Sequence, residues 1–467
     1  MKPFYHIDKK DIFGLLILVF SSLIFLGFKI SHLTFRFGDG NEYVYMASLL
    51  WKGILPYRDY FFVDPPGLIL LLSIFHFFYY KAPILFQLVP VILEIFNVAM
   101  LFLYLKKTNN LFYFFAPILY LFSFTVLSTS DYITGVQLVI CFSWLAILFG
   151  EYKKYFTSGI CWGLALCTKL YAIPLIVGWL ISVYFQNKQD KKRVIVSLLG
   201  LSAVCTVILL PFVLIDFTHL FSYIVLFHFN RTLGIDKGLI YRFFFQHEWL
   251  LIIGSFIGIW FGKKKLLVLP FLFIIFFFLL FPDLYYLYLD ILIAFLVYFL
   301  LEAILIIWNK KKLNKEFIGV IVIICYLFLL FNWFDYSTNF ASKGRFSNAV
   351  KIADAVKILP GNYPIYGSYE VVPLVALLSN RLIINNYIDT NPQGFSSFGQ
   401  NKAVISEQVV KNGAYIIGRI RKEKDEIKGF EGYFDIVLFK KYCSVVQLFP
   451  STSGEDDTHI GIFLCKE

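Results

Sequence analysis

The chain has 467 residues, of which 59% are hydrophobic, 20% aromatic and 16% charged, and its mean hydropathy is +0.73. Soluble domains carry about 25% charged residues, so this composition excludes a cytosolic globular enzyme and a disordered or fibrous protein. The net charge of +11 arises in residues 1–334, where basic clusters separate long apolar runs. This arrangement is typical of a membrane orientation signal and argues against a nucleic-acid partner.

Residues 1–334 are predicted to form a polytopic α-helical membrane domain with about eleven spans. A span ordinarily needs about 20 apolar residues, and several of those predicted here are shorter. The predicted spans are 12–30, 83–105, 111–127, 132–150, 156–168, 170–185, 194–215, 249–262, 266–281, 284–308 and 317–334. The first is expected to be a retained span, because it lacks the small-residue cleavage site of a signal peptide.

The basic clusters fix the predicted orientation. An even number of spans separates each neighbouring pair of clusters, so the positive-inside rule places all of them and the N-terminus in the cytoplasm of a multi-pass plasma-membrane protein. The C-terminal domain, residues 335–467, is then extracytoplasmic. The same condition makes 66–80 an interfacial helix and divides 156–185 into two short helices that turn near Lys169.

The first outer loop, residues 31–82, is unusually polar for a segment beside a bilayer. A short amphipathic helix is predicted over 41–52, capped by Asn41, with Asp39 before it and Glu42 in its first turn. These carboxylates either satisfy the helix N-terminus or belong to a membrane-level active site. In such a site a carboxylate acts as general base and nearby cations hold an anionic group.

The same loop contains the pattern D-x-x-x-Y-x-x-x-A, followed by G-x-x-P-Y-R-D and by P-P-G. It is carried by Asp39, Tyr43, Ala47, Gly53, Pro56, Tyr57, Arg58, Asp59, Pro65, Pro66 and Gly67. This pattern resembles the GT-C membrane glycosyltransferases, and more narrowly the branch of protein O-mannosyltransferases and the lipid A aminoarabinose transferase. The resemblance loosely covers residues 10–335. It implies transfer of one sugar from a polyprenyl phosphate, with inversion at the anomeric carbon.

The resemblance also implies roles for particular residues. Asp39 falls on the catalytic aspartate, and we group with it Glu42 and Asp131, which matches an acidic residue of the second outer loop. His228 and Arg231 match a segment that contacts lipid phosphate, and a tyrosine at an outer tip matches Tyr285 or Tyr286. The predicted substrate-contacting residues are Tyr43, Tyr57, Asp59, Asp64, Tyr285 and Tyr286.

Asp64 departs from the family pattern. The aminoarabinose transferase has a phosphate-binding lysine immediately before its proline, where this chain has Asp64. The donor phosphate is therefore expected to be neutralised by Arg58, Lys169 or Arg231, or Asp64 binds a divalent cation. No other cofactor is predicted.

The residue types suit this chemistry independently of the resemblance. Charge builds on the departing phosphate, which guanidinium or ammonium groups stabilise, and the acceptor hydroxyl must lose a proton to a carboxylate. We predict Asp39 as the base and Arg231 as the phosphate clamp. Alternative interpretations remain for three residues: Asp131 as a solvated turn residue, Lys169 as a lysine that snorkels to the interface, and His228 as an ordinary loop histidine.

Residues 335–467 are predicted to form a small α/β domain. Helices are expected over 343–358, 370–379 and 400–412, and strands over 363–367, 381–385, 414–418, 434–439 and 461–465. Cys443 and Cys465 form a disulfide if the domain faces an oxidising compartment, or remain two thiols; the sequence leaves both open.

The sequence thus predicts a membrane glycosyltransferase whose partners are a polyprenyl-phosphate sugar, membrane lipids and a lipid, protein or glycan acceptor. Two alternatives belong to other classes. A lipid or sugar transporter or flippase would show internal symmetry and charges at mid-membrane. In a non-catalytic membrane assembly protein, Asp39 and Asp131 would tolerate replacement.

Overall fold

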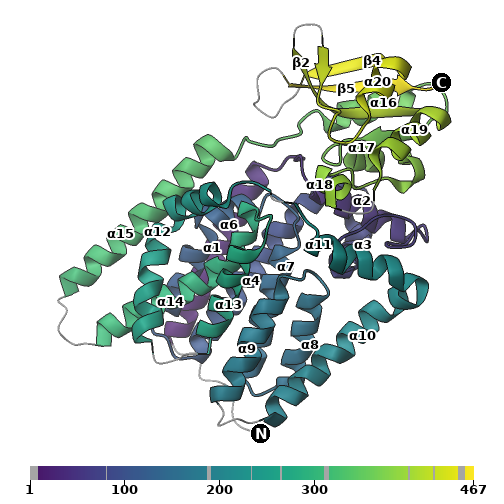
Figure 1. The fold of residues 1–467 in the computed structure, drawn as a ribbon. Coiled ribbons are helices and arrows are strands. Elements are labelled where there is room, and N and C mark those ends of the chain that lie inside the picture. The colour runs from purple at the N-terminus through teal and green to yellow at the C-terminus, as the bar shows by residue number, and fades with distance from the viewer. Residues whose placement is uncertain are drawn as a thin grey trace.

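A bundle of helices carries a small sheet with its own helices at one end (Figure 1). The structure is a computed structural model. It describes residues 9–79, 81–186, 191–232, 234–262, 266–309, 315–397, 400–423, 426–450 and 458–467.

The bundle consists of apolar helices of very different lengths. They are α1 (Lys9–Ser31), α2 (Gly40–Leu50), α3 (Gly67–Tyr79), α4 (Leu88–Lys107), α5 (Ala116–Leu121), α6 (Phe124–Thr129), α7 (Val136–Glu151), α8 (Tyr155–Leu166), α9 (Ala172–Gln186), α10 (Lys191–Phe221), α11 (Phe227–Phe229), α12 (Lys237–Phe261), α13 (Val268–Leu280), α14 (Asp290–Asn309) and α15 (Lys315–Asp335). Short 3-10 or π-helical turns join several of them, including η3 (Ser222–Leu226), η4 (Tyr286–Leu289) and η5 (Tyr336–Phe340).

Burial identifies the lipid-facing helices. Among the residues that the structure describes, five helical segments are long and apolar enough to cross a membrane: Lys9–Ser31, Pro83–Lys107, Lys191–Phe229, Lys237–Phe261 and Tyr286–Asn309. The last of these is 72% buried inside the protein and forms the centre of the bundle, whereas the segment containing α10 is only 11% buried. A helix that is apolar on its exposed faces requires a lipid environment, so the chain is a membrane protein.

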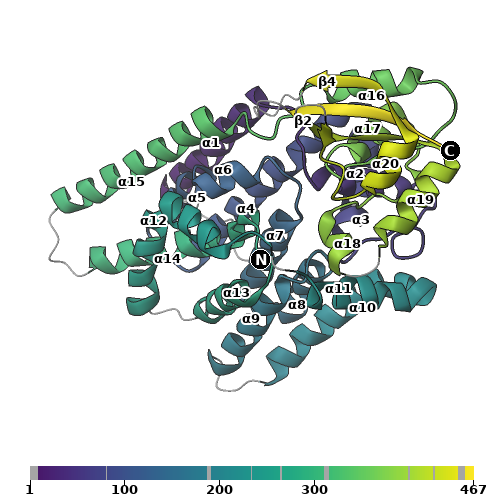
Figure 2. The ribbon, with the colours of Figure 1, turned by 45° about the horizontal axis from the view of Figure 1, so that its top comes forward.

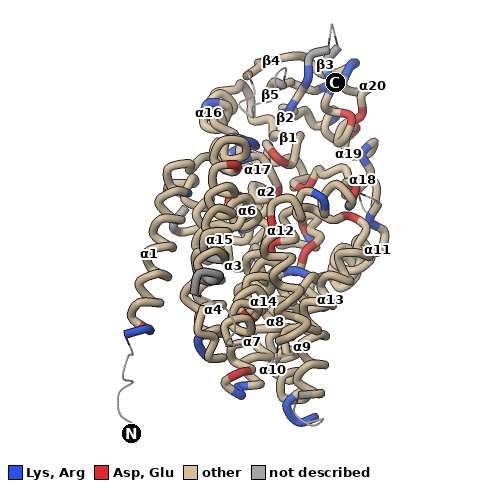
Figure 3. Tube along the Cα trace, turned by 90° about the vertical axis from the view of Figure 1, so that its left-hand side faces the viewer, with Lys and Arg blue, Asp and Glu red and all other residues tan. Residues whose placement is uncertain are grey.

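The two ends of the bundle differ in charge. Lys and Arg residues gather at the ends of α1, α4 and α10 that lie farthest from the C-terminal sheet (Figure 3). Acidic residues concentrate instead in the middle and toward the sheet. This distribution agrees with the alternation of basic clusters in the sequence.

Several predicted helices are confirmed and others are corrected. The run 156–185 is divided into α8 and α9 as predicted. The run 111–127 is not one helix, because Ser123 is extended and its side chain accepts a hydrogen bond from the backbone of Val126, which starts the separate helix α6. The predicted loop 216–248 is largely helical, since α12 begins at Lys237.

The first outer loop contains the two predicted helices, α2 and α3. Asn41 does not cap α2, because the helix begins at Gly40. Its side-chain amide instead donates to the backbone oxygens of Arg36 and Glu370, at 2.9 and 2.8 Å. Asn41 therefore connects the first loop to the C-terminal region.

The C-terminal region is a five-stranded sheet covered by short helices. Its elements are α16 (Ala349–Ile358), β1 (Ile365–Gly367), α17 (Val372–Ser379), η6 (Ile384–Asn386), α18 (Pro392–Ser397), α19 (Lys402–Asn412), β2 (Ala414–Glu423), β3 (Glu426–Lys428), α20 (Ile436–Tyr442), β4 (Cys443–Pro450) and β5 (Thr458–Cys465). The strand order is β1-β2-β5-β4, with β3 on β2. β1 and β2 are parallel and the other pairs antiparallel.

Two predicted strands of this region are wrong. Residues 381–385 contribute only an isolated bridge at Ile383. Residues 434–439 enter α20, because the Asp435 carboxylate accepts hydrogen bonds from Val437 and Leu438 and caps a helix there. The strand β4 was not predicted. It pairs with β5 and brings Cys443 and Cys465 together in a disulfide.

The C-terminal region lies on the first outer loop. α17 packs against α2, and α18 lies beside α11 (Figure 2), where the Thr232 hydroxyl donates to the Gln393 side chain at 2.8 Å. Residues distant in the sequence therefore meet between the bundle and the sheet.

Candidate functional site

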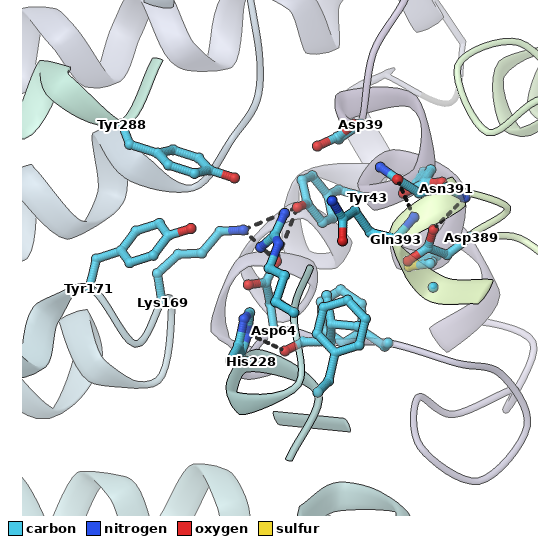
Figure 4. A pocket seen from close by; sticks show the side chains of 17 residues that line it. Asp39, Tyr43, Asp64, Lys169, Tyr171, His228, Tyr288, Asp389, Asn391 and Gln393 are labelled. Atoms are coloured by element: carbon cyan, nitrogen blue, oxygen red, sulfur yellow. Dashed lines mark hydrogen bonds and ion pairs between the residues drawn. The ribbon is translucent and has the colours of Figure 1, made fainter. Parts of the chain in front are cut away.

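A gathering of charged side chains lies where the first outer loop, the ends of the bundle helices and α18 meet. We call this cavity the central pocket (Figure 4). Its polar and aromatic lining residues are Asp39, Glu42, Tyr43, Asp64, Lys169, Tyr171, His228, Arg231, Tyr288, Asp389, Asn391 and Gln393. Seven of the sequence-predicted residues are among them: Asp39, Glu42, Tyr43, Asp64, Lys169, His228 and Arg231.

Asp39 immediately precedes α2, yet its side chain does not cap that helix. Its backbone oxygen accepts hydrogen bonds from the backbone of Glu42 and Tyr43, at 3.0 and 3.2 Å. The carboxylate faces the cavity instead. Burial raises the pKa of Asp39, and the ammonium of Lys169 opposes this shift in part. The helix-capping alternative therefore does not account for the Asp39 side chain.

Asp39 also borders a second cavity, which we call the tyrosine pocket. Its walls include Tyr132, Tyr285, Tyr369 and Glu370. Both cavities share Asp39, Tyr43, Lys169, Arg231, Tyr288 and Asn391. The Asp39 carboxylate and two cations therefore lie along the boundary between two adjoining chambers.

Lys169 lies in the turn between α8 and α9 and is paired with Asp64. Its ammonium forms a buried ion pair with the Asp64 carboxylate and donates to the Tyr43 oxygen at 3.1 Å. Tyr43 in turn donates to Asp64 at 3.0 Å, and Tyr57 donates to the Asp64 backbone oxygen at 2.7 Å. Asp64 is therefore the buried ion-pair partner of Lys169.

The P-P-G sequence explains how this ion pair is placed. The backbone N–H of Gly67 donates to the backbone oxygen of Cys167 at 2.7 Å, next to the turn that holds Lys169. A β-carbon at Gly67 would lie 2.5 Å from that oxygen, so only glycine permits the approach. The first outer loop is thereby fixed against the α8–α9 turn.

Arg231 is the second buried cation of the pocket. Its guanidinium pairs with Asp283 at 2.6 Å and lies over the rings of Phe227, Phe281 and Tyr285, while its Nε has no hydrogen-bond partner. A buried donor without a partner is available to a bound anion. Nearby, His228 Nε2 lies 3.1 Å from the backbone oxygen of Val63.

The C-terminal region supplies an acidic group that sequence reasoning missed, and this group lies beside the predicted residue Glu42. Asp389 lines the central pocket, and burial raises its pKa to about 7. Glu42 is buried with one carboxylate oxygen unpartnered. Burial, and then the charges of Asp389 and Asp39, raise the pKa of Glu42 well above its ordinary value. Acidic groups therefore line one side of the pocket, and Lys169 reaches in from the other (Figure 4).

Three predicted residues lie outside the central pocket, in a cleft of their own. Arg58 and Asp59 form an ion pair at 2.7 Å and, together with Tyr57, line a separate cleft between the first loop and the C-terminal region. Arg58 therefore lines a different cleft from Lys169 and Arg231, the other two residues predicted to bind the donor phosphate.

The two tyrosines of the outer tip diverge. Tyr285 lines the tyrosine pocket, whereas the Tyr286 hydroxyl lies 2.7 Å from that of Thr125 inside the bundle. Tyr288, which was not predicted, lines both pockets. Tyr288 follows Tyr286 by two residues in the same tip, and this position was a usable signal. Tyr171 likewise follows Lys169 by two residues.

Asp131 requires a correction, because it lines neither pocket. Its carboxylate is buried and pairs with Lys29 and Arg36, each at 3.0 Å, and accepts a hydrogen bond from Tyr336. We call Lys29, Arg36, Asp131 and Tyr336 the anchor cluster. Asp131 is therefore not a solvated turn residue. It holds α1, the first loop and the residue that follows α15 together.

Among the residues that the structure describes, no group of three or more His, Cys, Asp or Glu side chains is placed to hold a metal ion.

An apolar groove leads from the central pocket along the bundle. It has a volume of about 420 Å³ and shares Asp64, Lys169, Tyr171 and His228 with that pocket. The rest of its lining is almost entirely apolar and comes from Leu170, Ile173, Val225, Phe229, Phe277, Leu280, Phe281 and Pro282. The groove suits a hydrocarbon chain whose polar head lies at Lys169.

Solved structures of two proteins share this fold over nearly the whole chain. ArnT from Cupriavidus metallidurans bound to undecaprenyl phosphate matches with a TM-score of 0.62 at 10% identity, and its apo state with 0.59 at 13%. Both matches cover 96% of this chain and 97% of ArnT. The oligosaccharyltransferase of Archaeoglobus fulgidus, tethered with an acceptor peptide containing the NVT sequon, matches with 0.52 at 12% identity, covering 94% of this chain and 73% of that one. No protein-family profile and no curated protein sequence matches. The fold implied by the first-loop pattern is confirmed.

Proposed function

From the GT-C glycosyltransferase fold that the chain shares with ArnT and the oligosaccharyltransferase, we propose that it is an inverting membrane glycosyltransferase. It transfers a sugar from a polyprenyl phosphate to an acceptor hydroxyl at the outer face of the membrane. The observation that carries the proposal is the apolar groove ending at Lys169, next to a pocket in which the Asp39 carboxylate is not used by the fold.

The donor binds through its tail and its phosphate. The polyprenyl chain lies in the groove, and burial of its apolar surface provides most of the affinity. The phosphate lies against Lys169 and Arg231, which neutralise the charge that develops as the bond from phosphate to the sugar carbon breaks. Lys169 remains oriented by Asp64, which Tyr43 and Tyr57 in turn hold in place.

Asp39 is the general base. The donor sugar occupies the tyrosine pocket beside Tyr285 and Tyr288, and the acceptor hydroxyl enters the central pocket. Asp39 borders both chambers, so its carboxylate can take the proton of the hydroxyl that attacks the sugar carbon. A raised pKa brings this base closer to the pH at which it works, which favours proton transfer. Glu42 acts as a second buried acid beside it.

The charge asymmetry supports the orientation of the chain. The basic helix ends lie in the cytoplasm, as the positive-inside rule requires. Residues 1–334 then form the eleven-span catalytic domain, and residues 335–467 an extracytoplasmic domain that completes the pocket with Asp389, Asn391 and Gln393. The acceptor is a lipid, a protein or a glycan.

The test is turnover of the purified protein with a panel of labelled polyprenyl-phosphate sugars and an extract of membrane and cell-surface acceptors. Wild type and Asp39→Asn are compared, with and without divalent cations. Asp354→Asn, an exposed carboxylate of α16, is the matched control. Release of polyprenyl phosphate by wild type and Asp354→Asn alone supports the proposal. Donor binding with no sugar transfer in any variant would favour a transporter or flippase instead.

A further inference from the structure

The cleft that contains Arg58 and Asp59 is lined by residues that have no role in the proposed reaction. We call it the side cleft. It has a volume of about 280 Å³ and lies between residues 57–61 of the first loop, the π-helical turn η3 and the segments 385–387 and 400–405. That volume is close to the lower end of the range of small-molecule sites, which is about 300–1,000 Å³.

The side cleft adjoins the central pocket. Residues 57–61 line the side cleft, while Phe62, Val63 and Asp64 line the central pocket. Gly394 of the central pocket faces Phe61 and Gln400 of the side cleft, since a β-carbon there would touch both side chains, at 3.4 and 3.9 Å. A ligand in the side cleft therefore lies one side chain away from the pocket that holds Asp39.

The lining combines aromatic rings with planar amides. The rings are Tyr57, Tyr60, Phe61, Tyr223 and Tyr387, and the amides are Asn385, Asn386, Gln400 and Asn401. Aromatic faces bind the apolar C–H faces of pyranose rings, and an amide offers both a donor and an acceptor to neighbouring hydroxyls. A polyhydroxylated ligand fits both kinds of group.

Two polar atoms of the cleft lack partners in the protein. The Tyr60 side chain is 5% exposed and its hydroxyl makes no hydrogen bond, and the Oε1 atom of Gln400 is likewise buried and unpartnered. Buried polar groups without partners are rare and unfavourable. A ligand hydroxyl would supply the missing partner to each.

The charged groups that line the cleft are already paired. Arg58 pairs with Asp59, and His219 with Asp216 at 2.6 Å. This pairing favours a neutral ligand over a phosphate or a charged peptide. The walls are loops, helix ends and η3, and no strand of the sheet lines the cleft. Strand addition, a common mode of peptide binding, therefore has no edge to use here.

We propose that the side cleft binds a neutral oligosaccharide and that this saccharide is the acceptor of the transfer. The second part rests on the proposed function, whereas saccharide binding itself does not. Tyr60 and Gln400 hydrogen-bond the saccharide and Tyr223 stacks on it. Its terminal residue passes Phe61 to reach the central pocket.

The test is saturation-transfer difference NMR on the full-length protein in nanodiscs. The probes are tetrasaccharides of glucose, galactose, mannose and N-acetylglucosamine, and a neutral Ser/Thr-rich hexapeptide. Tyr60→Phe removes only the unpartnered hydroxyl, so the fold should be retained. Tyr152→Phe is the matched control, because Tyr152 is exposed at the end of α7 and lines none of these cavities. Tyr223→Ala removes the stacking face.

The expected result is binding of at least one tetrasaccharide that is weakened about twofold to tenfold by Tyr60→Phe, further weakened by Tyr223→Ala and unchanged by Tyr152→Phe. No saccharide signal, or equal weakening by both Tyr→Phe variants, overturns the proposal. Binding of the peptide alone also overturns it and reassigns the cleft. Thermal stabilisation by undecaprenyl phosphate is measured in the same samples. If undecaprenyl phosphate does not stabilise the wild-type protein, the proposed donor site is refuted, whatever the saccharide result.

Discussion

Asp39 and Asp131 are the two aspartates that the family resemblance makes catalytic, and the structure places them in different environments. Asp39→Asn preserves the shape of the side chain, which makes no cap hydrogen bond. We therefore expect the free energy of unfolding to change by less than about 0.5 kcal/mol. Loss of the general base should lower kcat by about 10²- to 10⁴-fold, which corresponds to about 3–5 kcal/mol of activation free energy.

Asp131→Asn should have the reverse pattern. It leaves the ammonium of Lys29 and the guanidinium of Arg36, which are 3% and 4% exposed, without their anionic partner. Removing one partner of a buried ion pair typically costs about 3–5 kcal/mol. The variant should therefore lose much of its thermal stability, while the molecules that remain folded retain an intact Asp39.

The assay measures donor turnover per folded molecule, with the folded fraction taken from size-exclusion chromatography and Tm from intrinsic fluorescence. Asp39→Asn is expected to be inactive with the wild-type Tm, and Asp131→Asn to be active with a lowered Tm. Wild-type turnover in Asp39→Asn would refute the role of Asp39 as general base. A catalytic defect in Asp131→Asn at unchanged Tm would refute the structural role of the anchor cluster.

Three further predictions concern the donor, the pH dependence and the orientation. Lys169→Met should weaken binding of undecaprenyl phosphate at least about tenfold, because it removes a charge-assisted hydrogen bond of about 1.5–3 kcal/mol; unchanged affinity in a titration would contradict the phosphate site. The folded pKa of Asp389 is about 7, above its ordinary value near 3.8, so its ionisation destabilises the fold progressively as pH rises from about 4 to 7. The Tm of Asp389→Asn should therefore exceed that of wild type. The difference in Tm should grow as pH rises over this range and stay constant at higher pH. A Tm difference that does not change with pH would exclude this effect. Lys107, in the last turn of α4, should resist an impermeant amine reagent added to whole cells; labelling from outside would reverse the proposed orientation.

Features encoded locally were predictable from the sequence. Apolar runs with basic ends identified most of the bundle helices, and the first-loop pattern identified Asp39 together with the fold. Seven of the predicted site residues line the central pocket because they lie on segments that meet at the end of the bundle nearest the C-terminal sheet. The turn at Lys169 was inferred from charge alternation alone, and α8 and α9 confirm it.

Features that depend on distant partners were not predictable. Asp131 is at the tip of a hairpin, and its ion pairs with Lys29 and Arg36, with the hydrogen bond from Tyr336, make it a buried ion-pair residue. Lys29 and Tyr336 are 102 and 205 residues away from it. Asp389 has no local pattern that points to the pocket. The run 434–439 is apolar enough for a strand, but the cap at Asp435 starts a helix. Tertiary contacts decided these three cases over local propensity.

The anchor cluster has a consequence for how the chain is made. Lys29 leaves the ribosome in the first helix, whereas Tyr336, which accepts a hydrogen bond from it at 2.9 Å, is synthesised 307 residues later. The ion-pair partner of Lys29, Asp131, is made 102 residues after it, about 5–20 seconds later at a synthesis rate of about 5–20 residues per second, whereas Tyr336 follows after roughly 15–60 seconds. Until Asp131 is in place, the ammonium must remain at the membrane surface, because an unpaired cation in the hydrocarbon region is unfavourable. Burial of Lys29 therefore proceeds in two steps, first by pairing with Asp131 and then by the hydrogen bond to Tyr336 that completes the anchor cluster.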